Sequence, residues 1–128
     1  VRLRKDEELL EDLLQGLKER IKKFVETEEY YSYIKELFLK MVDELEDGKY
    51  RLEVLEKDEL WWRDILHQGT WNKKFQLDTL KSFRLGGFLL SDSKESFQVD
   101  YTLLGILEDH RYDIGKLLHH TLRGEALE

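Results

Sequence analysis

Apolar side chains recur at a helical spacing over residues 1–26. Charged side chains fill the opposite face of this stretch. The pattern predicts an amphipathic helix, which either packs on a domain core or forms the end of a coiled coil. Some apolar positions of the stripe also lie one heptad apart, which is the spacing of a coiled-coil seam. They are Leu3, Leu10, Leu17 and Phe24.

A second helix is predicted to begin at Thr27, because a threonine side chain can cap the first turn of a helix. Apolar positions then repeat at intervals of three and four residues, which is typical of a helix with one buried face. We expect Asp47-Gly48 to end this helix, since glycine tolerates the backbone conformation that follows a last turn. The predicted buried face comprises Tyr30, Ile34, Leu37, Phe38, Met41, Val42 and Leu45.

The middle of the chain predicts a strand, a short helix and a further strand. Residues 49–56 alternate between apolar and polar side chains, which is the pattern of a half-buried strand. Asp58 is predicted to cap a helix over residues 59–66 that carries Trp61 and Trp62. A weaker alternation within residues 70–82 favours a second short strand.

Residues 83–102 predict a β-hairpin that leads into a helix. Apolar residues over 83–90 predict its first strand, turn formers follow at 91–93, and an alternation over 97–100 predicts its second strand. Gly86-Gly87 inside the first strand indicates a bulge or a close approach of another backbone.

Asp100 and Thr102 can cap a last helix, which the apolar pattern predicts over residues 101–122 and which Gly124 would end. The elements together predict an α+β fold, with a small, mainly antiparallel four-stranded sheet packed by helices. An amphipathic or coiled-coil helix precedes this sheet.

The chain of 128 residues is long enough for one domain with an appended helix. Residues 27–126 are predicted to form the globular domain, and residues 1–26 the appended helix. Because the first residue is Val1, we expect a fragment of a longer chain. Leu127-Glu128 can derive from a vector and is given no function.

Charge and composition exclude several classes of function. The net charge of -7 argues against nucleic acid and against anionic membrane surfaces, and favours a partner with a basic face. The chain has no cysteine, which excludes disulfides and thiolate metal sites. Neither a membrane span nor a signal peptide is visible.

No catalytic, cofactor or metal site is predicted from the polar residues. The adjacent side chains of His119-His120 point about 100° apart on a helix, so they are poorly placed to chelate one metal ion. His110, like His119 and His120, is expected to have a structural or surface role, and His67 is expected at the surface. The carboxylates fall on solvated faces. Gly86-Gly87 lacks the spacing of a phosphate-binding loop. This outcome favours an interaction protein.

Trp61 and Trp62 are the strongest candidates for a binding surface in the domain. Tryptophan combines a large apolar area with a polar N–H group and is enriched at protein interfaces. We expect the pair to pack on the core with one side and to contact a partner with the other.

Several short motifs, in their order along the chain, resemble the C-terminal globular half of the E-type stalk protein of V-type and archaeal A-type rotary ATPases. A tyrosine-rich helix at 33–45 precedes a charged strand at 50–54 and an acidic helix start at Asp58. The Gly-Gly strand at 86–90 and the Val-Asp-x-Thr sequence at 99–102 then lead into the last helix. Tyr101 stands where the family usually has Asn, so the chain resembles a divergent member.

The resemblance covers residues 8–122 and implies a function without catalysis. The E-type protein belongs to the peripheral stalk, the stator that stops the catalytic head from turning with the rotor. In the family, a long N-terminal helix pairs with a second stalk subunit, of the G or H type, and the globular domain holds a nucleotide-binding subunit of the head. By this resemblance Leu3, Leu10 and Leu17 would face the second stalk subunit. The chain would be cytoplasmic, peripheral to a membrane-bound ATPase, without a cofactor and not inserted in the membrane.

Two other interpretations stay open from the sequence. A regulator of flagellar or type III secretion ATPases resembles the E-type stalk protein in this half, and it binds and restrains an export ATPase. A small ligand-binding α+β domain would instead use Trp61, Trp62 and His67 to line a concave apolar pocket.

Overall fold

The computed structural model describes residues 2–123, and the side chains of residues 7–117 and 119. Its helices are α1 (Arg2–Phe24), α2 (Glu28–Glu44), α3 (Glu59–Gln68), α4 (Leu103–Asp109) and α5 (Arg111–Arg123). Its strands are β1 (Gly48–Val54), β2 (Lys73–Thr79), β3 (Gly87–Asp92) and β4 (Gln98–Thr102). Two single-turn helices complete the fold, η1 (Glu56–Asp58) and η2 (Ser82–Arg84).

The four strands form one sheet in the order β2-β1-β3-β4. The β1–β3 and β3–β4 pairs are antiparallel, while β1 and β2 are parallel and are joined through α3. A crossover helix is the usual connection between two parallel strands. The predicted α+β class, with a mainly antiparallel four-stranded sheet packed by helices, is therefore confirmed.

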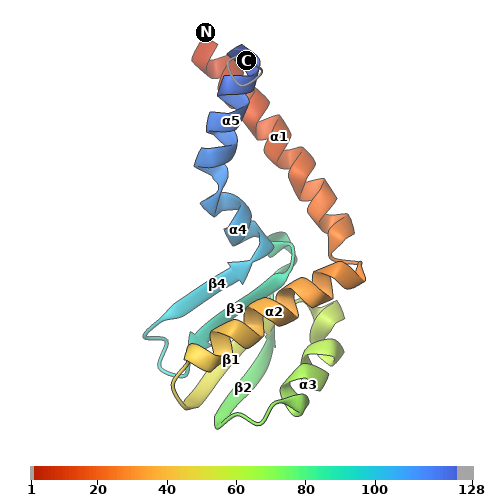
Figure 1. The fold of residues 1–128 in the computed structure, drawn as a ribbon, viewed down its shortest axis with the longest axis vertical. Helices are drawn as coiled ribbons and strands as arrows, with labels where there is room; N and C mark the ends of the chain where they lie inside the picture. The colour runs from red at the N-terminus through yellow and green to blue at the C-terminus, as the bar shows by residue number, and fades with distance from the viewer. Residues whose placement is uncertain (1, 124–128) are drawn as a thin grey trace.

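The core lies between α2 and one face of the sheet (Figure 1). Ile34 and Phe38 of α2 are fully buried, as are Leu52 of β1 and Leu90 of β3. Leu52 and Leu90 are paired residues in neighbouring strands, so they share one face of the sheet. The predicted helical face of α2 and the predicted alternation in β1 are both confirmed.

An arm made of α1 and α5 extends from this layered domain (Figure 1). α1 joins the domain at its C-terminal end. α4 follows β4 and packs on the domain through Leu103, and α5 then extends away from it. The first turns of α1 and the last turns of α5 lie side by side at the tip of the arm. The predicted N-terminal helix is therefore present and packs against the C-terminal helix.

The prediction of a single last helix is wrong, because the helix is interrupted at His110, which separates α4 from α5. The N–H of His110 lies 3.3 Å from the Ile106 oxygen and 3.2 Å from the Leu107 oxygen, so the turn tightens there. Residues 108–113 are all polar or aromatic-polar. This segment therefore has no apolar face that could pack on the domain and keep the helix continuous.

Three predicted element boundaries are also wrong. α2 ends at Glu44, and Gly48 begins β1 instead of ending the helix. Phe83 lies in η2 and Phe97 precedes β4, so neither belongs to a strand. β3 begins only at Gly87, because the chain first turns through η2.

Gly86-Gly87 does provide the predicted close approach. The φ angle of Gly87 is 80°, in the left-handed region that favours glycine. A Cβ atom at this position would overlap the carbonyl oxygen of Tyr101 in β4. The glycine therefore lets β3 enter the sheet directly against β4.

Candidate protein-binding surface

The apolar stripe of α1 is divided between the interior of the molecule and its surface. Leu14 is 3% exposed, whereas Leu13 is 39% exposed and Leu17 is half-buried. Successive helical positions are about 100° apart, so Leu13 and Leu17 are close neighbours on one side of α1. The side chain of Leu3 lies outside the described residues.

α5 packs against the stripe at Leu10. A Cβ atom added to Gly115 would lie 3.4 Å from a methyl carbon of Leu10, so the absence of a side chain there brings α5 close to α1. An ion pair joins Arg111 of α5 to Glu11 of α1. Leu10, predicted to face a partner, therefore contacts the C-terminal helix of the same chain.

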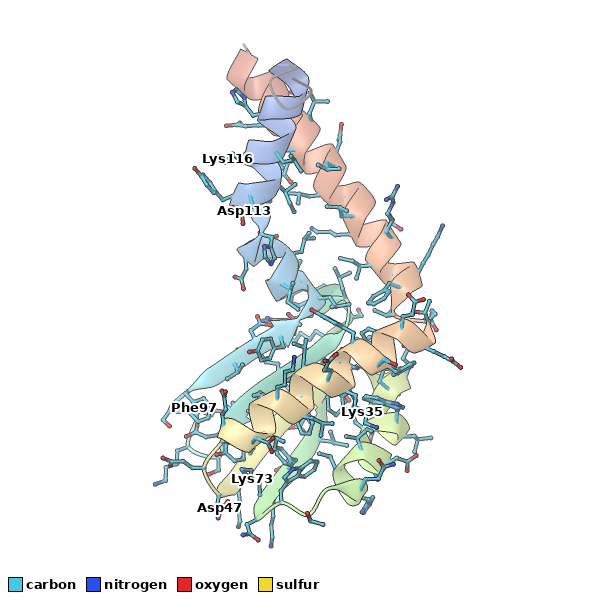
Figure 2. All side chains as sticks on the ribbon, in the orientation of Figure 1. Lys35, Asp47, Lys73, Phe97, Asp113 and Lys116 are labelled. Atoms are coloured by element: carbon cyan, nitrogen blue, oxygen red, sulfur yellow. The ribbon has the colours of Figure 1, made fainter. Side chains whose placement is uncertain are left out.

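A hollow of about 620 Å³ opens along this helix pair. Leu10 and Gly115 contribute its apolar part, and Tyr112, 77% exposed, stands beside it. The charged residues around it are Glu108, Arg111 and Lys116, with His119. Lys116 and Asp113 lie on α5 in the arm (Figure 2).

The surface of the arm thus carries exposed apolar side chains surrounded by charged ones. Leu13 and Tyr112 are exposed, and an acidic group formed by Glu7, Glu8, Glu11 and Asp12 lies on α1. Apolar positions flanked by charges form the surface by which one amphipathic helix accepts another. The arm is therefore the candidate site for a partner helix.

The two tryptophans differ in burial, whereas the prediction gave both of them one side in the core and one side toward a partner. Trp62 is fully buried, with its ring centroid 5.1 Å from that of Phe38 and 5.3 Å from that of Phe88. Trp61 is half-buried against Tyr31, at 5.1 Å between ring centroids. Trp62 therefore belongs to the core, and a partner at this place would meet Trp61 alone.

The ligand-binding interpretation placed Trp61, Trp62 and His67 around one pocket, but their burial differs. Trp62 lies inside the core, and His67 is exposed at the end of α3. A hollow of about 640 Å³ lies elsewhere, between the end of α1 and the loops after β1 and β2. Its lining includes Val25, Leu80 and Leu85.

A polar cluster around the buried Asp58 lies at the base of the arm and was not predicted from the sequence. Asp58 has no exposed surface and does not cap α3 with its side chain, contrary to the prediction. Its carboxylate accepts hydrogen bonds from Tyr30 at 3.2 Å, from Tyr31 at 2.6 Å and from Lys57 at 2.8 Å. We call these four residues the Asp58 cluster. In the sequence these residues are two tyrosines and a distant Lys-Asp pair, and no local pattern indicates that they meet.

The cluster shifts the pKa values of its members. Burial raises the pKa of the Tyr30 hydroxyl well above its ordinary value of 10.0, and the carboxylate of Asp58 raises it further. Burial and the hydrogen bond to Asp58 also raise the pKa of Tyr31. Partial burial lowers the pKa of Lys57, but hydrogen bonds to Asp58 and Tyr31 outweigh this, so its pKa is raised overall.

These shifts predict that the fold loses stability in alkali. Above about pH 10 the unfolded chain releases the Tyr30 proton while the native chain keeps it, so the free energy of unfolding falls as pH rises. One such tyrosine contributes a slope of about 1.4 kcal/mol per pH unit, and Tyr31 and Lys57 act in the same direction. Urea unfolding across this pH range measures the slope.

Tyr30→Phe should reduce that slope by about 1.4 kcal/mol per pH unit, because phenylalanine has no proton to lose. Tyr112→Phe is the matched control, since Tyr112 is largely exposed and outside the cluster. An unchanged slope in Tyr30→Phe would contradict the burial of this hydroxyl.

No group of three histidine, cysteine or acidic side chains in the described part of the chain could hold a metal ion. None of the described helices is both long and apolar enough to cross a membrane.

Comparison of the chain with models of known protein families gave no match. A search among curated proteins gave no match either. The inference of function therefore rests on the residues and their geometry.

Proposed function

We propose that this chain is a stator component, the E-type protein of the peripheral stalk of a V-type or A-type rotary ATPase that moves protons or sodium ions. The observation that carries the proposal is the α1–α5 arm, an amphipathic helix pair that extends from a small α+β domain (Figure 1). The motifs that resemble the E-type protein support it: Gly87 is the first residue of β3, and Thr102 caps α4.

In this proposal the arm binds a helix of the second stalk subunit. α1 has 23 residues, and at 1.5 Å per residue it spans about 35 Å. α5 packs against Leu10, whereas Leu13 is exposed on one side of α1 and Leu17 is half-buried. A partner helix would pack on this remaining side, with its charged flanks facing the acidic residues of α1.

The globular domain would hold the nucleotide-binding subunit of the head. The end of the domain opposite the arm carries Phe97, Asp47 and Lys73 (Figure 2). Phe97 is 41% exposed, and Asp47 and Lys73 form an ion pair at 3.9 Å. The net charge of -7 would orient the domain toward a basic face of the head.

A stator of this kind supplies mechanical resistance and no catalytic group. The head tends to turn with the rotor, and a protein bound to both stalk and head opposes that rotation through its contacts. Such a role requires a long helix pair and two binding surfaces, and it requires no active-site pocket. The chain would act in the cytoplasm, peripheral to the membrane-bound complex.

Leu13→Glu should weaken binding of the second stalk subunit by about tenfold or more, which corresponds to ~1.4 kcal/mol. The substitution places a charge at the centre of the proposed helix contact, where burying it is unfavourable. Titration of the chain with the purified second stalk subunit, followed by calorimetry, measures the change.

Leu60→Glu provides the matched control, because Leu60 is 78% exposed on α3, away from the arm. It should bind the second stalk subunit as the parent chain does. Equal affinities for Leu13→Glu and the parent would show that the arm does not bind through this side.

A further inference from the structure

The link between α1 and α2 is short and lies at the base of the arm. α1 ends at Phe24 and α2 begins at Glu28, so residues 25–27 alone connect them. The side chain of Thr27 accepts from the N–H of Tyr30 and caps α2. The direction in which α1 leaves the domain therefore depends on contacts made by this link and its neighbours.

Lys57 contacts the link and the domain at the same time. Its ammonium group donates to the carbonyl oxygen of Val25 at 2.7 Å and to Tyr31 at 3.1 Å. Val25 directly follows α1, where helical carbonyl groups lack partners and a positive charge is favourable. One ammonium group thus joins the end of α1, the first turn of α2 and η1.

Asp58 fixes the position of this ammonium group. The carboxylate is fully buried, 2.8 Å from the Lys57 nitrogen. Tyr30, which also donates to Asp58, accepts from the N–H of Gly87 at 2.8 Å. The chain of contacts therefore runs from the end of α1 through Lys57 and Asp58 to the first residue of β3.

We propose that Lys57, held by Asp58, is a lock that sets the angle between the arm and the domain. Without the ammonium group, the Val25 carbonyl has no tie to η1. Because α5 packs against α1 at Leu10, the two helices of the arm would then pivot together, about residues 25–27 and about the interruption between α4 and α5 at His110. The packing of Phe24 on Tyr30, at 5.8 Å between ring centroids, would remain but allows rotation. The lock concerns this chain alone and holds whether or not the chain is part of a stator.

Distances between two spin labels test the lock. The chain has no cysteine, so Asp12→Cys in α1 and Lys35→Cys in α2 give two unique labelling sites, both exposed. In the parent chain the distance distribution should be narrow. Lys57→Met, which keeps the apolar stem and removes the charge, should broaden the distribution and shift its maximum.

A second variant and a control keep the test decisive. Lys57→Met combined with Asp58→Asn removes both charges, so no unpaired charge is left buried if the single variant folds poorly. Lys81→Met is the control. Lys81, like Lys57, lines the hollow of about 640 Å³ at the end of α1, but it takes part in none of the ion pairs found among the described residues. Broadening in the Lys57 variants, with near-ultraviolet circular dichroism unchanged, supports the lock. A distribution as narrow as that of the parent in both Lys57 variants overturns it.

Discussion

Phe38→Ala should lower the free energy of unfolding by about 3–5 kcal/mol, as large-to-small substitutions of buried aromatic residues do. Phe38 has no exposed surface, and its ring contacts four others. The ring-centroid distances are 5.1 Å to Trp62, 5.8 Å to Trp71, 5.4 Å to Phe75 and 5.8 Å to Phe88. Truncation leaves a cavity between α2 and the sheet that rigid aromatic neighbours fill poorly.

Urea unfolding followed by circular dichroism measures this loss. A domain of this size has a stability of about 5–15 kcal/mol, so the variant is expected to fold with a small remaining margin. Leu39→Ala is the control, because Leu39 is the next residue along α2 and is 38% exposed. Its effect should be within about 0.5 kcal/mol. A loss of less than about 1 kcal/mol in Phe38→Ala would contradict the packing of α2 on the sheet.

Asp58→Ala should also lower the free energy of unfolding by about 3–5 kcal/mol, the usual effect of removing one partner of a buried charge pair. The change leaves the buried hydroxyl of Tyr30 without the carboxylate to which it donates. It also leaves Lys57, whose side chain is 33% exposed, without its counter-ion. Since Lys57 can move toward solvent, we expect the lower end of this range.

Two further variants distinguish a loss of stability caused by the Asp58 cluster from one caused by removing any surface charge. Asp58→Asn should lose less stability than Asp58→Ala, because the amide keeps one oxygen acceptor for the tyrosines. Glu36→Ala removes an exposed ion pair with Lys40 at 3.6 Å and should change stability by about 0.5 kcal/mol or less. If Asp58→Ala is as mild as Glu36→Ala, the carboxylate does not hold the base of the arm together.

Elements with strong local patterns were predictable from the sequence. The spacing of Tyr30, Ile34 and Phe38 marked the buried side of α2, and all three are fully buried. Thr27 and Thr102 were recognisable as caps because capping depends on residues within one turn. Period-two alternation likewise located β1 and β2, although it left their parallel pairing undetermined.

Features that depend on distant residues were not predictable. The Asp58 cluster joins residues 27 and 28 positions apart, and Tyr30 binds the backbone of Gly87 from 57 positions away. Asp58 before a helix looked like a cap, and only tertiary packing turned its side chain inward. The contact of Leu10 with Gly115 is equally non-local, so the stripe of α1 alone could not show that α5 shares it.

The two ATPase interpretations differ in partner and share the fold. A stator of a rotary ATPase and a regulator of an export ATPase would both present a small α+β domain with a helical arm. Neither the arm nor the Asp58 cluster separates the two interpretations, so the partner decides between them.

Binding of the whole chain to purified nucleotide-binding head subunits of the V/A-type ATPase from the same source tests the stator proposal most directly, with an export ATPase as control. We expect binding to the head subunit that weakens as salt is added, because the chain is acidic and salt screens its attraction to a basic face. The export ATPase should not bind. Binding to the export ATPase alone, or to neither protein, would contradict the assignment of this chain to the stator.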